Sequence, residues 1–149
     1  MKQVLLSVLL AGVIASAQAY DLGTVVGSDI QEGKGVFTNL GVNAAAHEGK
    51  FSAIAEMHRE FKGNTNKYSL LAGYDFAKIG TITFTAKAGA AYVKPDHGTD
   101  GYAALAGVGA SMPVFDHVSA TLDVRHQFGQ DRIESVNGNT ILVGARYSF

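Results

Sequence analysis

Apolar and polar residues alternate along most of this chain with a period close to two, which is the pattern of extended strands whose two faces differ. From Lys50 onward, turn-forming residues such as Gly63 and Pro95 separate segments of about 11 residues that show this alternation. The segments are residues 50–61, 67–77, 81–93, 101–112, 118–128 and 139–149. Residues 35–47 and a shorter segment, 20–27, precede them, so the pattern predicts an all-β fold of eight antiparallel strands.

The apolar face of these strands can be buried in two ways. In a soluble sandwich it would form the core, with the polar face in water. Segments of about 11 residues exceed the usual strand of about five or six, however, and match the 9–11 residues of a tilted membrane-spanning strand. A closed barrel is the β-structure that can span lipid, because it leaves no backbone group unpaired. We therefore predict an eight-stranded antiparallel transmembrane β-barrel, with a soluble sandwich as the alternative.

Aromatic residues favour the membrane barrel, because they occupy the ends of the apolar faces while aliphatic residues occupy the middles. With strand directions alternating back from the last strand, one group holds Phe61, Tyr68, Tyr92, Tyr102 and Phe128. The other group holds Phe51, Tyr74, Phe76, Phe84, Tyr147 and Phe149. Two such belts around an aliphatic band are typical of barrels that lie in lipid.

An even number of strands places both ends of the barrel domain on one side, which is the periplasmic side in outer-membrane barrels. Periplasmic turns are expected at residues 46–49, 78–80 and 113–117. Outward loops are expected at residues 28–34, 62–66, 94–100 and 129–138. The longest loop carries Asp131, Arg132 and Glu134, and it is the first place to expect a surface ligand.

The first 19 residues have the layout of a secretory signal peptide. Lys2 precedes an apolar run that is too short for a membrane helix, and Ala17 and Ala19 mark a cleavage site after Ala19. Residues 20–149 would then form the barrel domain. The absence of cysteine excludes disulfides and thiolate metal sites, and the net charge of −1 gives no reason to expect nucleic acid.

The carboxy-terminal stretch ILVGARYSF, residues 141–149, resembles the signal read by the bacterial barrel-assembly machinery, with Tyr147 and Phe149 as its key residues. Residues 86–114 are similar to the YfaZ group of outer-membrane proteins. Residues 20–149 as a whole resemble the small eight-stranded outer-membrane barrels of the OmpA-domain, OmpX and opacity-protein type. The resemblance implies the cell outer membrane, contact with lipid and lipopolysaccharide, and assembly by that machinery. The loops are shorter than in adhesin-like members, so an adhesive role is not carried over.

Charged residues of the opposite face would point into the barrel, where eight strands leave space for little more than side chains. They are Glu56, His58, Glu60, Asp75, Lys87, Asp123, Arg125 and Arg146. Because an unpaired buried charge costs several kcal/mol, we expect a mutual network, with Arg146 paired to Asp75. Such a network predicts a plugged, non-enzymatic barrel with a structural or surface role and no cofactor. The alternative is a small or gated pore, for which inward glycines leave room: Gly73, Gly89, Gly107, Gly109 and Gly144.

Other chemistry finds less support. His117 and Ser119 resemble the His-x-Ser pair of lipid A deacylases, but they fall at a periplasmic turn, and Ala120 replaces the asparagine of that family. The histidines at 47, 58 and 97 are too scattered for a metal site, and His126 faces lipid near the outer rim. Arg59 also lies outward near that rim, where it would extend toward lipid headgroups or bind a lipopolysaccharide phosphate.

Overall fold

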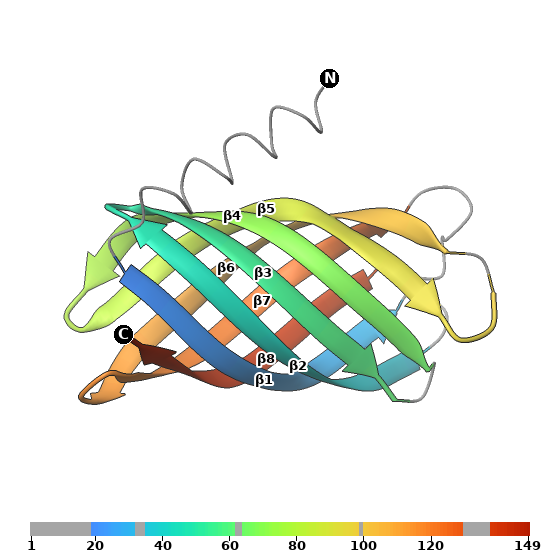
Figure 1. Ribbon diagram of the computed structural model, residues 1–149, viewed down its shortest axis with the longest axis horizontal. Coiled ribbons are helices and arrows are strands. Elements are labelled where there is room, and N and C mark those ends of the chain that lie inside the picture. Colours follow the sequence, from blue (N-terminus) through green and yellow to red (C-terminus); the bar gives the residue numbers. More distant parts are fainter. Residues whose placement is uncertain (1–18, 32–34, 62–63, 99, 130–137) are drawn as a thin grey trace, which may run out of the picture.

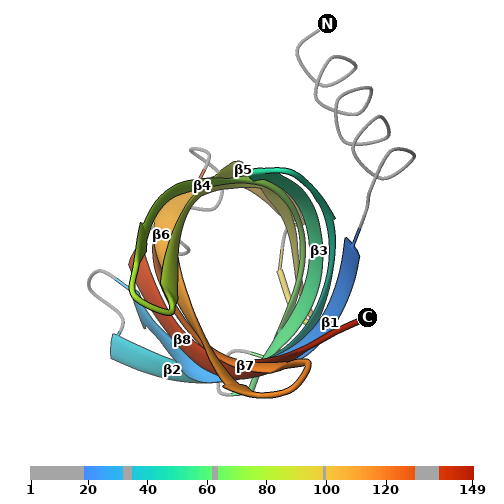
Figure 2. The ribbon, with the colours of Figure 1, turned by 90° about the vertical axis from the view of Figure 1, so that its left-hand side faces the viewer.

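Eight antiparallel strands form a closed barrel in the computed structural model, which describes residues 19–31, 35–61, 64–98, 100–129 and 138–149. Each strand pairs with its neighbours in the sequence, and β8 pairs with β1 to close the ring (Figures 1 and 2). The strands are β1 (Ala19–Gln31), β2 (Gly35–Glu48), β3 (Phe51–Glu60), β4 (Thr65–Ile79), β5 (Ile82–Pro95), β6 (Gly101–Phe115), β7 (Val118–Gly129) and β8 (Gly138–Ser148). The described residues contain no helix that is long and apolar enough to cross a membrane.

Both described chain ends and three short turns lie at one end of the barrel, here called the turn end (Figure 1). Its turns centre on Gly49, Gly80 and His117, each of which has a positive φ of 58°, 62° and 67° respectively. Glycine adopts this conformation without strain, whereas at His117 the side chain makes it costly. The opposite end, here called the loop end, carries the longer connections.

Two details differ from the sequence prediction. The segment predicted to be short, residues 20–27, belongs to a full-length β1 of 13 residues. Pro113 was predicted to lie in a turn, but it belongs to β6, next to a register shift between Pro113 and Phe115. A bulge is a place where a strand tolerates proline, because the missing N–H is not needed for the ladder. The last three residues of β6 therefore extend the strand rather than end it.

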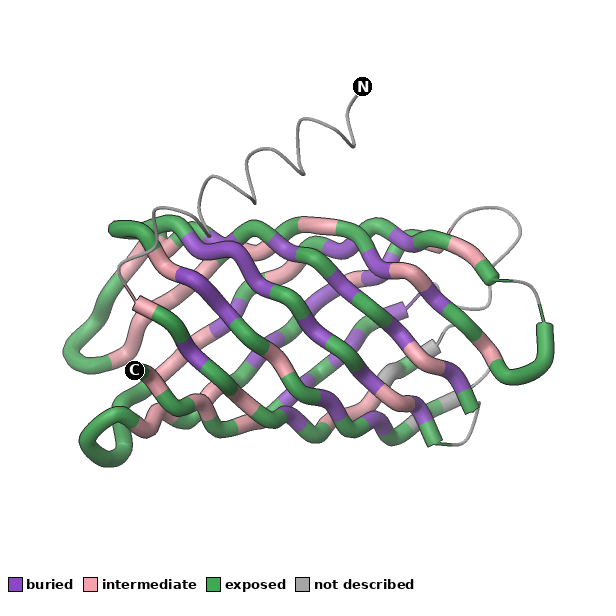
Figure 3. The backbone as a smooth tube through the Cα atoms, in the orientation of Figure 1, coloured by how far each residue is buried: buried purple, intermediate pink, exposed green. Residues whose placement is uncertain are grey.

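The two faces of the sheet have opposite character, and the apolar face is the exposed one (Figure 3). Large apolar side chains on all sides of the barrel remain about half exposed; Leu22, Leu70 and Val143 are 53%, 53% and 54% exposed. Buried positions alternate with them along each strand and hold polar groups such as Glu56 and Arg125. A soluble sandwich would require the reverse, so that alternative is wrong and the transmembrane barrel is confirmed.

Candidate functional site in the barrel interior

The inward face concentrates charged and polar side chains at mid-height and at both ends of the barrel. Period-two alternation places them there, because every second residue of a strand points to the axis. The buried polar side chains are Asp21, Asn39, Ser52, Glu56, His58, Glu60, Thr65, Lys67, Ser69, Asp123, Arg125, Gln127 and Thr140. Apolar residues fill part of the space between them, with Leu71 and Leu142 each only 1% exposed.

Arg125 bridges opposite walls of the barrel. It lies on β7, and its guanidinium binds both carboxylate oxygens of Glu56 on β3, with Nη1–Oε2 and Nη2–Oε1 distances of 2.5 and 3.1 Å. Strands β3 and β7 are diametrically opposed in a ring of eight, so this bidentate pair crosses the lumen. Arg125 also lies 3.9 Å from Asp123 Oδ2, and Lys87 Nζ donates to Asp123 Oδ1 at 2.5 Å. These four residues are called the central network below.

Glycine makes space for the central network. A Cβ atom at Gly109 would overlap Asp123 Oδ1 and come within 3.1 Å of Lys87 Nζ. At Gly41 a Cβ would come within 2.7 Å of the His58 ring, which therefore lies flat over that glycine. His58 Nε2 is 3.3 Å from Glu56 Oε2, so the ring joins the network as an ion-pair partner when protonated.

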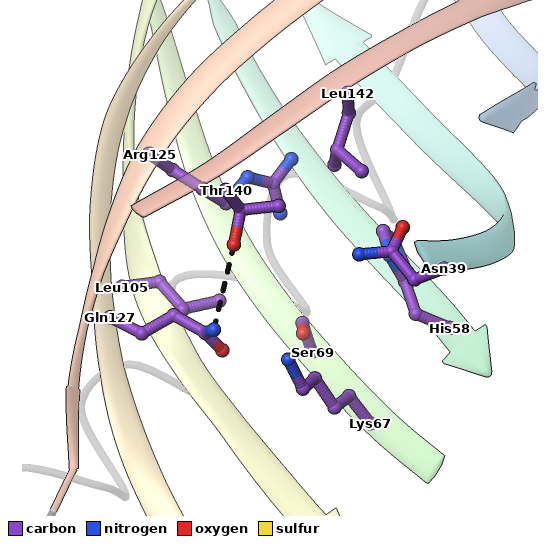
Figure 4. Close-up of a pocket in the computed structure, with 9 residues that line it drawn as sticks. All are labelled: Asn39, His58, Lys67, Ser69, Leu105, Arg125, Gln127, Thr140 and Leu142. Atoms are coloured by element: carbon purple, nitrogen blue, oxygen red, sulfur yellow. Dashed lines mark hydrogen bonds between the residues drawn. The ribbon is translucent and has the colours of Figure 1, made fainter. Parts of the chain in front are cut away.

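A small pocket lies on the loop-end side of Arg125 (Figure 4). Its volume is about 20 Å³, which is sufficient for a single water molecule. Asn39 Oδ1 and His58 Nε2 line it, and neither atom has a hydrogen-bond partner among the residues that the structure describes. Gln127 on β7 donates to Thr140 Oγ1 on the neighbouring strand β8 at 3.5 Å, as the dashed line in Figure 4 shows.

At the turn end the predicted pairing of Arg146 with Asp75 is wrong. Arg146 Nε lies 3.1 Å from Asp21 Oδ2, as an ion pair without hydrogen-bond geometry, and His47 Nε2 lies 2.5 Å from the same oxygen. The register explains this choice, because Asp21 is on β1, next to the Arg146 strand, whereas Asp75 is on the opposite wall. Asp75 instead accepts a hydrogen bond from Thr85 Oγ1 at 2.6 Å.

A cavity of about 250 Å³ separates these groups at the turn end, and we call it the vestibule. Asp21, His47, Asp75, Thr85, Lys87 and Arg146 are among the residues that line it. A second pocket of about 20 Å³ follows toward the middle, and Lys87 and Arg146 line both. Among the residues that the structure describes, the central network therefore lies between the wide vestibule and the small pocket on its loop-end side.

Three interior polar residues escaped the sequence analysis: Asp21, His47 and Lys67. Lys67 Nζ lies 3.4 Å from Glu60 Oε2 near the loop end, and Asp21 pairs with both His47 and Arg146 at the turn end. Each is in phase with inward residues of its own strand, and each is one of the first or last residues of the segment predicted for that strand. Applying the alternation to these end residues would have assigned them to the interior.

The predicted aromatic residues all lie on the outward face, in contacts confined to one end of the barrel or the other. At the loop end Tyr92 stacks between Tyr68 and Tyr102, with ring centroids 6.5 and 5.4 Å apart. Phe61 and Phe128 lie exposed at the same end. Ring pairs at the turn end are Phe51 with Tyr74, Phe76 with Phe84, and Tyr147 with Phe149, at 5.1, 6.4 and 5.1 Å.

The end of β8 is held on both sides. Phe149 N donates to the carbonyl of Tyr20 at 2.9 Å, and Ser148 N donates to the carbonyl of His117 at 2.8 Å. The His117 ring lies 3.0 Å from the Ser148 carbonyl and 5.8 Å from the Tyr147 ring. Within the described residues this histidine therefore contacts the end of the chain, and its ring is not positioned by Ser119.

Outward polar residues near the loop end are engaged with other protein groups. Arg59 Nη1 and Nη2 donate to Asp96 at 3.1 and 2.8 Å, and this pairing holds the pKa of Asp96 below its usual value. Asp96 N also donates to the Asn64 carbonyl, so the β5–β6 loop is tied over the β3–β4 turn. His126 bonds Asn139 on the neighbouring strand. Asp131, Arg132 and Glu134, predicted for a surface ligand, lie outside the described residues, as does most of the predicted signal peptide.

No family model and no curated protein sequence matches the chain. Solved structures do match it along nearly its whole length. Neisserial surface protein A has a TM-score of 0.68 at 14% identity, covering 88% of this chain and 97% of its own. Ail, the attachment invasion locus protein of Yersinia pestis, has a TM-score of 0.58 at 13% identity, covering 88% and 97%. A de novo designed transmembrane β-barrel has a TM-score of 0.64 at 13% identity, covering 90% and 98%.

These similarities concern the fold, because identity of 13–14% carries no residue-level correspondence. The matches cover nearly the whole of both chains, as expected for a closed barrel of the same strand number. The chain therefore has the fold of the small eight-stranded outer-membrane β-barrels.

Proposed function

We propose that the protein is a non-enzymatic outer-membrane barrel with a closed interior and a structural or surface-facing role. The observation that carries this proposal is the Glu56–Arg125 pair, which spans the lumen between opposite walls. Lys87 and Asp123 extend this pair into a network of ion pairs, and the two small pockets beside it have room for about one water each. A cross-brace of this kind fixes the shape of the barrel and blocks passage of solutes.

The placement of the ends supports an orientation in which the turn end faces the periplasm and the loop end faces outward. The surroundings of the protein would then be outer-membrane lipid and lipopolysaccharide along the two aromatic belts. The barrel-assembly machinery would read Tyr147 and Phe149 during insertion. Export would require the signal peptide predicted for residues 1–19.

Heat modifiability tests the membrane barrel directly. A closed barrel has no free strand edge at which detergent could begin to separate the strands, so the folded protein should remain intact in SDS at room temperature. We expect different gel mobilities before and after boiling, together with recovery in the outer-membrane fraction. Equal mobility in both lanes and recovery from the soluble periplasmic fraction would contradict the proposal.

Planar-bilayer recording tests the closed interior. We expect no stable unitary conductance from the wild-type protein, because the central network blocks the axis. Arg59→Gln removes an outward charge of the same type and is the matched control for Arg125→Gln. Like the wild-type protein, Arg59→Gln should show no stable unitary conductance. Stable wild-type openings that change in Arg125→Gln or Lys87→Gln would show that ions pass through the network instead.

A small or gated pore is the second candidate, and one observation favours it. The vestibule and the two small pockets follow one another along the axis, and consecutive cavities are interrupted by charge pairs rather than by apolar packing alone. Rearrangement of the two ion pairs would connect these cavities. The conductance experiment above distinguishes the two functions.

A further inference from the structure

The vestibule is a cavity at the turn end, and the central network does not account for its presence. Strands β1 to β6 and β8 contribute to its walls, and it measures about 250 Å³. It is more than ten times larger than either of the two small pockets beside the central network.

The charges around the vestibule are paired with one exception. Asp21 binds Arg146 and His47, and Lys87 binds Asp123. Of the inward carboxylates whose side chains the structure describes, Asp75 is the one that has no cation within 4 Å. The pairing of Arg146 with its neighbouring strand therefore leaves a carboxylate facing the cavity without a counter-charge.

Hydroxyl groups line the same cavity as that carboxylate. Thr85 donates to Asp75 Oδ1 at 2.6 Å, and Thr83 lies opposite Ser111 in the β5–β6 register, with all three hydroxyls lining the cavity. A carboxylate and several hydroxyl oxygens offer the acceptors that a primary ammonium group requires, since it has three donors and no acceptor. A divalent metal such as calcium takes six to eight oxygen ligands, and one carboxylate is a poor basis for such a site.

We propose that the vestibule binds a small organic cation carrying a primary ammonium group, with Asp75 as its anionic partner. The volume suits a molecule smaller than a typical drug, such as a short aliphatic diamine. Arg146 on the opposite wall repels positive charge, so one ammonium group of the diamine binds on the β4–β5 side and the other extends toward the turn-end opening. This site lies beyond the structural role proposed above and is independent of it.

The test uses the folded protein in zwitterionic detergent micelles at low salt, where charge interactions are least screened. Putrescine is titrated while amide chemical shifts are followed by NMR, and 1,4-butanediol serves as the neutral analogue of the same length. We expect saturable shifts for putrescine at residues around Asp75 and none for the diol. Asp75→Asn should weaken binding about tenfold or more, since it removes the charge-assisted hydrogen bond.

Two further variants distinguish binding in the vestibule from a general effect of the protein's charge on the cation. Asp116→Asn removes the same charge from an exposed turn at the same end, outside the cavity, and should leave the affinity within about twofold of wild type. Ser111→Leu fills the cavity without changing charge and should weaken binding as Asp75→Asn does. Gel mobility before and after boiling verifies that each variant is folded. Equal affinity of wild type and Asp75→Asn, an equal loss in Asp116→Asn, or no saturable binding to wild type would overturn the proposal.

Discussion

Glu56→Ala is expected to lower the free energy of unfolding by about 3–5 kcal/mol, because removing one member of a buried ion pair leaves the other charged and unpaired. Of the two ion pairs described above, Arg125 would keep the weaker one, with Asp123, whose Oδ2 is 3.9 Å from Nη2. The protein has no tryptophan, so urea unfolding in lipid vesicles is best followed by circular dichroism or by the fraction that resists SDS.

Asp116→Ala provides the matched control, since Asp116 is an exposed carboxylate in a turn and its loss should change stability by about 0.5 kcal/mol or less. The double variant Glu56→Gln, Arg125→Met should lose less than Glu56→Ala, because no charge is then left unpaired at that site. If Glu56→Ala were as stable as Asp116→Ala, the Glu56–Arg125 pair would have no role in holding the barrel.

Gly89→Ala should prevent or strongly impair folding, with a loss of at least about 3 kcal/mol. A Cβ atom at Gly89 would overlap the backbone carbonyl oxygen of Leu70 and come within 2.7 Å of Leu71 Cα, both on β4. A flexible side chain could move away, but these atoms belong to the strand that pairs with β5. The folded fraction after refolding into detergent, measured from gel mobility, would show the effect.

The adjacent residue gives a control on the same strand. Ala88 faces outward, so Ala88→Val adds more volume than Gly89→Ala but adds it toward lipid. We expect its folded fraction to equal that of the wild type. Equal folding of Gly89→Ala and Ala88→Val would mean that β4 and β5 can separate at this point at little cost.

Strand number, pairing order and the identity of the wet face could be predicted from the sequence, because all three follow from a period-two pattern repeated eight times. Alternation assigns a residue to a face regardless of what its neighbours are. For this reason Glu56, Lys87, Asp123 and Arg125 were correctly assigned to the interior, and the structure brings them together. Their inward placement needed no knowledge of the register.

Specific partners could not be predicted, because they depend on register and on strand position around the ring. Arg146 and Asp75 are at similar height, but they lie on opposite walls, and Asp21 on the adjacent strand is nearer. Asp21 itself was overlooked although it lies within the predicted segment 20–27, because the residues of that weakly alternating strand were not assigned to faces. The missing assignment in the first strand thus changed the predicted partner of a residue in the last strand.

The distribution of tyrosine has a practical consequence for spectroscopy. All six tyrosines project from the outside of the barrel near one rim or the other, and the chain has no tryptophan to mask them. Their ultraviolet emission therefore reports on the two membrane–water boundaries and is blind to the lumen. A single tryptophan introduced at a lumen position would give a separate optical signal from the interior, with no competing indole to subtract.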